Sequence, residues 1–528
     1  MTNKKIWDFY EKGLNYQREM GFANNWPMYE DFKMGKQWPS PTEKTAHMPR
    51  PVLNMISYIV NQRKSNVLNS AIKMVFTPFQ LSDDKQAEKK AIKGAEDFTN
   101  LATALWESID QDELNDRIVE DAATNGTGFL HYFWDVDKKT KNNKLGDVSG
   151  EVIDPINIFF SNPQTEDLEK QECIIISNRL PVEKVREMAI KNGISKTIAD
   201  EIKSDYPEIT YEAEKTGEKG LEKVTVLTAY YKKEVEKTYE KDGKKYITKE
   251  KKVFFVKTTE NTLITKEIEM PLTIYPIAKF IWKRRKKSVF GAGEVEGIIP
   301  NQKAINFNIA MQLLAVQDLA WPKLLIKEGS INQKITNEPG EMIVDYSQTG
   351  DGIKYMQTPN FSSLPLLLTD RLTEYTRMMT GVTEVATGDA FTSTMSAAAI
   401  IALQNQAKLP IQVITKNFYR TIEKVGRIWQ QFFNYYYIGK RNIVINSKGY
   451  EIETGKYQDL DFKLKIDVGS SSSYSESLAM STLEMLLDKG HIDVGTYIEL
   501  IPNTVMPFKE ELKSILESKQ INSNQHII

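Results

Sequence analysis

The side chains that most often carry catalysis or bind metals are few and scattered in this chain. There is one cysteine, Cys173, and the four histidines, His47, His131, His491 and His526, are far apart in the sequence. Nucleophilic catalysis and transition-metal binding need such groups close together. We therefore expect no catalytic residues, no metal site, no disulfide framework and no cofactor.

The sequence motifs of nucleotide-driven and hydrolytic enzymes are also missing. The chain has no Gly-x-x-x-x-Gly-Lys-Ser/Thr loop, no Gly-x-Ser-x-Gly elbow and no His-Glu-x-x-His pair, so an ATP-driven motor is not expected. Gly291-Ala292-Gly293 lacks the third glycine of a dinucleotide fingerprint, and we interpret it as a turn before a helix. Glu294 and Glu296 would then lie in the first turn, where the helix dipole favours carboxylates. His131, in a Leu-His-Tyr-Phe strand, is interpreted as a hydrogen-bonded sheet residue.

Composition indicates an ordinary folded protein with balanced charge. Of the 528 residues, 41% are hydrophobic and 27% are charged, and 69 basic against 71 acidic side chains leave a net charge of −2. This balance argues against a broad basic surface that grips nucleic acid, but it is compatible with a protein past which nucleic acid slides. The basic run Lys283–Lys287 fits either a solvated loop or a patch facing phosphates.

Hydropathy predicts neither a membrane span nor a secretion signal. No run of 18 or more apolar residues occurs, and the N-terminal residues carry charge without an apolar core. A membrane helix and a signal peptide both need such an apolar run. We expect a protein that is made and kept in a cytoplasm.

The order of predicted elements is helical, then rich in strands, then dominated by long helices. Apolar spacing predicts helices over 54–73 and 85–109, a glycine stop at Gly126 and a strand over 129–134. A mixed sheet follows over 152–279, with an inserted helix over 182–192 and an Asp-Gly hairpin turn at 242–243. Pro300 can begin a helix that ends before Trp321-Pro322, and turn signals then mark a β-rich insert.

The longest predicted helix begins at Ser396, a natural N-cap, and reaches Tyr437. Pro410 should kink it, because proline removes a backbone hydrogen bond; two separate helices are the alternative. Its apolar residues recur at spacings of three and four, and we interpret them as core: Ile411, Ile414, Phe418, Ile422, Val425, Trp429 and Phe432.

Several short motifs occur in a characteristic order along the chain. They are Gly126-Thr127-Gly128 before a strand, Asp154-Pro155 at a strand start, Gly291 to Asn306 leading into a helix, and Thr380-Gly381-Val382-Thr383-Glu384 followed by Ser396-Ala397-Ala398-Ala399-Ile400. This ordered set, with a β-rich insert between two helices, resembles the portal proteins of tailed bacteriophages over most of the chain, from about Met1 to Ser518.

The resemblance implies a ring, usually of twelve subunits, at one vertex of an icosahedral capsid. Double-stranded DNA is packaged and later ejected through such a ring. The implied partners are other copies of the chain, double-stranded DNA, the large terminase subunit, a head-to-tail adaptor, and the major capsid and scaffolding proteins, with no membrane. The implied location is the virion, after assembly in the host cytoplasm.

The resemblance also implies an α+β portal fold with a definite order of parts. A wing with a helical N-terminus and a mixed sheet would span 1–287, a first stem helix region 288–321, a clip 322–359, a second stem helix 360–381, a tunnel loop 382–395, a long kinked wing helix 396–440, and a helical crown with the C-terminal tail 441–528.

Three groups of residues become candidates for function by this resemblance. The tunnel loop would contribute small polar residues to the DNA channel: Thr383, Thr387, Gly388, Asp389, Thr392, Ser393 and Thr394. Such residues can surround a duplex without the base contacts or dense positive charge that would arrest it. Arg371, Arg377 and Lys303 would lie on the stem, either facing the channel or bridging subunits. Clip residues for docking the terminase or adaptor would be Lys323, Lys327, Lys334 and Glu338.

Two other classes of protein stay open as alternatives. Another virion ring, such as a head-to-tail adaptor, would usually be shorter and would lack a β insert between paired helices. A nucleic-acid-processing enzyme would need a carboxylate cluster for metal ions, which we cannot assemble from this sequence.

Overall fold

Helix α13 (Gln412–Tyr436) runs through the middle of the body and organises its core. In the computed structural model its whole apolar stripe is buried, with Phe418, Ile422, Val425, Trp429 and Phe432 at 0% exposure. The interpretation of this stripe as core is therefore confirmed. Pro410 lies in a 3-10 turn (Leu409–Ile411) directly before α13, where a missing N–H costs no bond within the α-helix.

The structure describes residues 1–70, 72–79, 84–138, 146–205, 222–241, 244–320, 324–332, 334–335, 342–347, 352–355, 363–382, 409–437, 439–445, 448–457, 460–468, 473–501 and 506. The predicted helix start at Ser396 and the hairpin turn at 242–243 lie outside these residues.

Helices fill the N-terminal part of the body. They are α1 (Asn3–Glu19), α2 (Phe22–Lys33), α3 (Met55–Leu68), α4 (Lys85–Ser108) and α5 (Gln111–Asn125). Side-chain caps explain where two of them begin: Asn54 accepts from the backbone N–H of Ser57 in α3, and Asp84 accepts from that of Gln86 in α4. Gly126 ends α5 in a left-handed conformation with φ 96°, as predicted.

Two sheets follow α5. The first has the order β3 (Asp147–Ile153), β2 (Thr127–Asp135) and β9 (Ile277–Ile281). The second has the order β4 (Ile158–Phe160), β5 (Cys173–Pro181), β6 (Lys223–Lys241), β7 (Lys244–Thr258) and β8 (Ile268–Glu269), with α6 (Val182–Lys191) and α7 (Lys196–Asp200) after β5. All pairings among the described strands are antiparallel, so the expectation of a mixed sheet was wrong. Most of these strands are joined by connections too short for parallel crossovers.

Strand β1 (Ile72–Pro78) pairs with β14 (Phe462–Val468) from near the other end of the chain. The helix predicted over 54–73 instead ends at Leu68, because the alternating residues Met74 and Phe76 are buried by this pairing. Gly426 of α13 lets the pair approach closely, since a Cβ there would lie 2.3 Å from Leu464 Cδ2.

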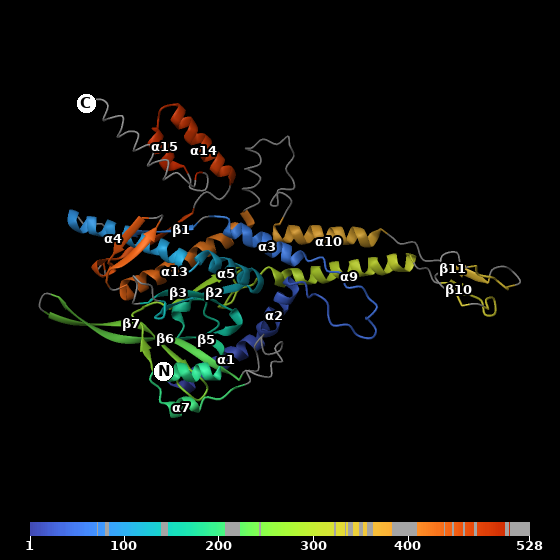
Figure 1. Cartoon of the computed structure of the whole chain (residues 1–528), viewed down its shortest axis with the longest axis horizontal. Helices are drawn as coiled ribbons and strands as arrows, with labels where there is room; N and C mark the ends of the chain where they lie inside the picture. The colour runs from blue at the N-terminus through green and yellow to red at the C-terminus, as the bar shows by residue number, and fades with distance from the viewer. Residues whose placement is uncertain are drawn as a thin grey trace.

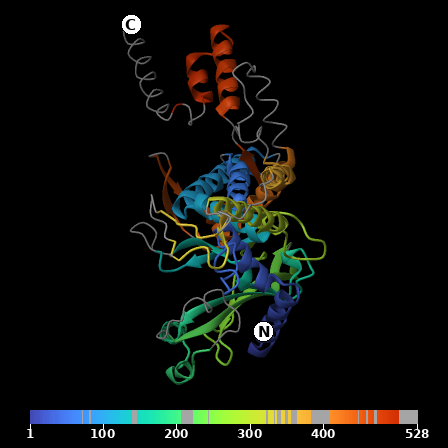
Figure 2. The same ribbon diagram turned by 90° about the vertical axis from the view of Figure 1, so that its right-hand side faces the viewer.

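The strands that the resemblance assigns to the crown contact the helices of the body. The hairpin β12 (Arg441–Ile445) and β13 (Lys448–Ile452) lies against α4, and β14 lies against α13. Helices α14 (Ser473–Asp488) and α15 (Val494–Leu500) stand apart from the body in two perpendicular views (Figure 1, Figure 2).

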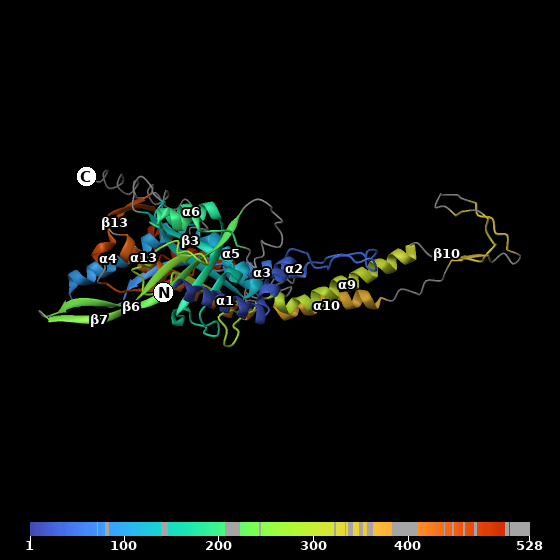
Figure 3. The same cartoon turned by 90° about the horizontal axis from the view of Figure 1, so that it is seen from below.

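A pair of long helices projects from the body. Helices α9 (Val295–Ala320) and α10 (Leu364–Thr380) lie side by side, and the two-stranded sheet of β10 (Leu324–Ile326) and β11 (Ile353–Tyr355) stands at their far end (Figure 1, Figure 3). Helix α9 begins at Val295 and not at Pro300, because Val295, Ile298 and Ile299 are buried in the body and extend the helix backwards. Among the described residues, no helix is long and apolar enough to cross a membrane.

Two glycine segments pack backbone against backbone where α9 leaves the body. A Cβ on Gly126 would lie 2.5 Å from the carbonyl carbon of Gly291, and one on Gly293 would lie 2.4 Å from the carbonyl oxygen of Thr124. The N–H of Glu294 donates to the carbonyl of Ala123 at 2.7 Å. The Gly291-Ala292-Gly293 motif is thus a close-packing turn before a helix, as interpreted from the sequence.

This packing predicts opposite effects for two glycine substitutions on one segment. Gly293→Ala should lower the free energy of unfolding by about 3 kcal/mol, because the new methyl group meets backbone atoms that cannot move aside. Gly297→Ala, inside α9 with open space around it, should raise it by about 0.5 kcal/mol through helix propensity. Urea unfolding of both variants measures this, and equal stabilities would contradict the close packing.

Candidate functional site

Amide and hydroxyl side chains join the two projecting helices. The amide of Asn301 in α9 donates to Thr376 Oγ1 of α10 at 3.0 Å, and that of Asn308 donates to Thr369 Oγ1 at 2.6 Å. The Gln312 amide also donates to Thr369 Oγ1, at 2.9 Å. Hydrogen bonds of this kind fix the register of the helices, which apolar packing alone would leave free to slide.

A buried ion pair holds the start of α9. The Glu294 carboxylate accepts from Arg63 Nε at 3.2 Å, from Arg63 Nη2 at 3.0 Å and from the Trp282 indole at 2.9 Å, while its second oxygen lies 2.7 Å from Lys283 Nζ. Its side chain is 2% exposed. Burial acts to raise the pKa of Glu294, but the charges of Arg63 and Lys283 outweigh it and hold the pKa below the ordinary value.

A second polar cluster fixes the next turns of α9. Gln302 accepts from the backbone N–H of Met55 at 2.9 Å and donates to the carbonyl of Leu53 at 2.6 Å. Asn306 donates to Gln37 Oε1 at 2.6 Å. Each contact joins α9 to α3 or to the loop before it, so the direction of the projecting pair is set by the body.

The structure separates the three charged residues predicted on the stem. Arg371 of α10 is exposed and pairs with Glu374 of the same helix at 2.9 Å. Arg377 is half-buried and lies over the Tyr58 ring of α3, with 5.7 Å from its guanidinium carbon to the ring centroid. Lys303 lies over the Phe32 ring at 5.4 Å. The three therefore face different surroundings and form no common site.

The predicted loop and clip residues are only partly within the described structure. All seven tunnel-loop residues, together with Lys323 and Glu338, lie outside the described residues. Lys327 and Lys334 are exposed beyond the far end of α9. The described chain stops at Val382 and resumes at Leu409, and a Cβ on Gly381 would lie 3.5 Å from Pro410 Cβ. The segment that holds the predicted tunnel loop therefore begins and ends at nearly the same point.

An apolar stripe on α10 is the main surface feature that sequence reasoning missed. Seven large apolar side chains of α10 are between 50% and 72% exposed, and all of them except Leu366 form one stripe: Leu364, Leu367, Leu368, Tyr375, Met378 and Met379. The stripe reaches the edge of α9 at Met379, whose Sδ lies 4.0 Å from Asn301 Nδ2. The stripe's spacing of three and four is visible in the sequence. Without the position of α9, however, this spacing does not distinguish an exposed helix face from one buried in the core. Exposed apolar patches on folded proteins mark binding surfaces.

The basic run Lys283–Lys287 is partly used inside the subunit. Arg284 Nε lies 2.6 Å from Glu166, Arg285 pairs with Glu296, and Lys283 binds the buried Glu294. Three of its five charges thus face carboxylates of the same chain. This pairing favours a structural role over a phosphate-facing patch.

Two residues of types that often act in catalysis, His131 and Cys173, have structural roles here. His131 Nδ1 lies 2.8 Å from Glu151 Oε1 and Nε2 lies 2.8 Å from the Tyr230 hydroxyl, which confirms the sheet interpretation. Burial raises the pKa of the Cys173 thiol to about 12 and so removes its nucleophilic form at neutral pH. Among the described residues, no group of three or more potential ligands could hold a metal ion.

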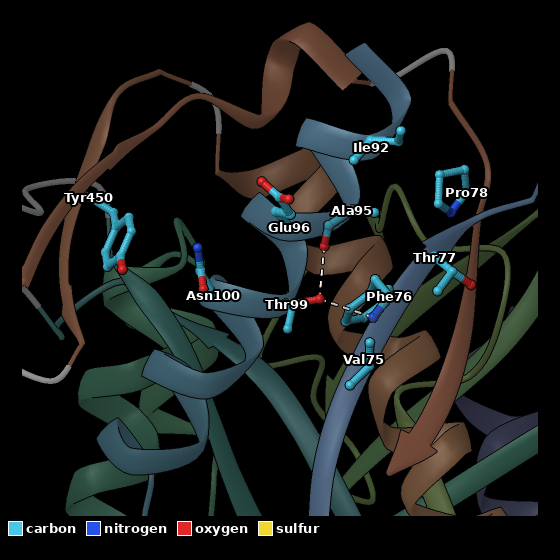
Figure 4. A pocket seen from close by; sticks show the side chains of 10 residues that line it. All are labelled: Val75, Phe76, Thr77, Pro78, Ile92, Ala95, Glu96, Thr99, Asn100 and Tyr450. Atoms are coloured by element: carbon cyan, nitrogen blue, oxygen red, sulfur yellow. Dashed lines mark hydrogen bonds between the residues drawn. The ribbon is translucent and has the colours of Figure 1, made fainter. Parts of the chain in front are cut away.

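A groove of about 510 Å³ lies between β1 and α4, with Tyr450 of β13 at its edge (Figure 4). Thr99 closes its floor by donating to the carbonyl of Ala95 at 2.8 Å and accepting from the N–H of Phe76 at 3.0 Å. Glu96 is the single charged residue of its lining, so the groove offers no cation for a phosphate.

Comparison with known proteins assigns this architecture to a family. A model of the phage P22-like portal protein family matches residues 25–525. A search of curated proteins finds no match. Because the match covers nearly the whole chain, the chain belongs to the phage P22-like portal protein family.

Membership makes the chain a portal protein of a tailed bacteriophage, a virion component of the head-to-tail connector that takes part in genome packaging. Proteins of this family are in general structural and not enzymes. The resemblance found in the sequence is confirmed by this match.

The buried ion pair predicts a pH-dependent stability. Because the pKa of Glu294 is lowered on folding, its contribution is present above about 4.5, the ordinary value, and is lost as the pH falls below it. Glu294→Gln leaves Arg63 buried without its anion and should lower the free energy of unfolding by about 3 kcal/mol at pH 7. The difference in the free energy of unfolding between this variant and the unmodified protein should become smaller in acid.

Thermal unfolding from pH 3 to pH 8 measures this effect. Glu296→Gln, which changes a surface ion pair two residues along the chain, is the control and should cost less than about 1 kcal/mol. Equal losses for the two variants would contradict a special role for the buried pair.

Proposed function

We propose that copies of this chain form a ring around a channel that carries double-stranded DNA into and out of the capsid. By resemblance the ring would have twelve subunits. Helices α9 and α10 would be its stem, the β10–β11 sheet its clip, the body its wing, and α14 with α15 its crown. The observation that carries the proposal is the exposed apolar stripe of α10 in a chain of this family.

The stripe gives the free energy that assembly needs. Burying one large apolar side chain contributes about 2 kcal/mol, and the stripe offers six of them on one helix. In a closed ring the same contact recurs at every subunit boundary. Contacts with the neighbouring subunits would then stabilise the stem in addition to its contacts with the body of its own subunit.

The segment between Val382 and Leu409 is proposed as the tunnel loop. Its two ends meet at Gly381 and Pro410, so it can project as a loop without displacing α10 or α13. Its threonines and serines would contact the duplex weakly and reversibly. Few fixed cations would release few counterions, which keeps DNA free to slide.

The far end of the stem is proposed as the docking site for the large terminase subunit and then for a head-to-tail adaptor. Lys327 and Lys334 are exposed there, and Leu325 and Met342 are 63% and 86% exposed. Mixed apolar and charged surfaces suit partners that are exchanged during assembly. The major capsid and scaffolding proteins would contact the wing.

Charged substitutions in the stripe should prevent assembly without unfolding the subunit. Leu367→Glu combined with Met378→Glu places two carboxylates at the proposed boundary, where burying them costs several kcal/mol. Light scattering should show monomers in place of rings, with an unchanged circular dichroism spectrum. Ile190→Glu, at a 45% exposed site on α6, is the control and should leave rings intact. Rings formed by the double variant would contradict the proposal.

Bulky residues in the tunnel loop should act on DNA and not on assembly. Replacing Thr392, Ser393 and Thr394 with tryptophan should narrow the channel and impair packaging or DNA retention, because the residues no longer let a duplex pass. Ring formation should be unchanged by electron microscopy. Loss of rings would instead place this segment at a subunit boundary.

A further inference from the structure

We propose that the apolar stripe of α10 on one copy packs into a hollow beside α9 on the next copy. This inference rests on the proposed ring and states which surfaces meet in it. The hollow has a volume of about 690 Å³ and lies between α9 and the loop that joins α2 to α3. We call it the α9 hollow; its lining includes Phe32, Trp38, Pro39, Lys303 and Phe307.

A ring with cyclic symmetry needs two different surfaces on every subunit, because each copy contacts its neighbours head to tail. The stripe on α10 supplies a convex apolar surface. Figure 1 shows α10 on one side of α9 and the loop of residues 34–54 on the other. The α9 hollow is therefore on the opposite side of the stem from α10, as the second surface of a head-to-tail contact must be.

The walls of the α9 hollow suit the side chains of the stripe. Phe32, Trp38 and Phe307 present aromatic surface, which leucine and methionine side chains fill well. The Trp38 indole donates to the carbonyl of Pro51 at 2.9 Å, which fixes this wall before any partner arrives. Phe307 is 52% exposed in the single subunit and would be covered by the neighbour.

The charges at the two surfaces are also complementary. Lys303 is exposed at the rim of the α9 hollow, where its Nζ lies over the Phe32 ring. The other rim lysine, Lys36, already pairs with Asp31 at 3.5 Å. Beside the stripe, the exposed carboxylates are Asp370 and Glu374, and Glu374 lies 2.9 Å from Arg371 of the same helix. A neighbour placed on the hollow would bring these carboxylates towards Lys303.

The register of the stem puts the matching residues at the same level. The hydrogen bonds Asn301 to Thr376 and Asn308 to Thr369 align α9 and α10 antiparallel. By that alignment Lys303 is level with Glu374. Rotation about a ring axis moves a subunit sideways without moving it along the axis. If the stems run nearly parallel to the axis, residues at similar heights on neighbouring stems therefore meet.

An exchange of charges between the two surfaces tests this contact. Lys303→Glu and Glu374→Lys should each lower the fraction of protein in rings roughly tenfold at fixed concentration, because like charges then face each other at every boundary. The two changes combined should restore rings. Lys184→Glu, at an exposed position on α6, is the matched control and should have no effect.

The outcomes separate this inference from the proposed function. Rings that persist in both single variants, or that stay lost in the combined variant while circular dichroism shows folded protein, would overturn the contact and leave the ring itself standing. Failure of the unmodified chain to form rings would overturn both.

Disulfide trapping gives an independent test that does not depend on charge. Phe307→Cys combined with Arg371→Cys places one thiol on each surface at similar levels, and the native Cys173 is buried and unreactive. Mild oxidation of assembled protein should give a ladder of covalent oligomers on a non-reducing gel. Each single variant should stay monomeric on the gel, and a double variant that also stays monomeric would overturn the contact.

Discussion

The buried contact between Glu294 and Arg63 is the interaction on which the projecting half of the molecule depends. It joins the residue directly before α9 to α3, while Trp282 and Lys283, which follow β9, contact the same carboxylate. Burying an ion pair is costly unless all its hydrogen bonds are satisfied. Here the hydrogen bonds of Glu294 fix the angle at which α9 leaves the body. That angle determines where α10 and the β10–β11 sheet lie.

The stem then divides its surfaces by chemistry. Asparagine, glutamine and threonine side chains lie between α9 and α10, so the pair has a fixed register without needing an apolar seam. The large apolar side chains of α10 are thereby left for the outside. A helix pair that met through its leucines would be stable alone and would have little to offer a neighbour. This division explains how a single subunit can be folded while the apolar side chains of α10 remain exposed.

The sequence predicted best the features that depend on neighbours along the chain. The stripe of α13, the glycine stop at Gly126 and the turn before α9 follow from local spacing and backbone freedom. The pairing of β1 with β14 could not be predicted, because no local signal joins strands so far apart. Pro300 predicts a helix start because proline favours that position, but α9 begins five residues earlier, where Val295 is buried. Arg371, Arg377 and Lys303 share one prediction, but their surroundings depend on how α9 and α10 pack against α2 and α3.

The most direct test of the ring is electron microscopy of the purified chain, combined with its mass from light scattering. We expect rings with a central opening wide enough for a DNA duplex, and a mass that is a whole multiple of the 60.5 kDa subunit and so gives the subunit count. A monomer or compact dimer that persists across salt and protein concentration would contradict it, because the apolar stripe of α10 would then have no neighbour to cover it.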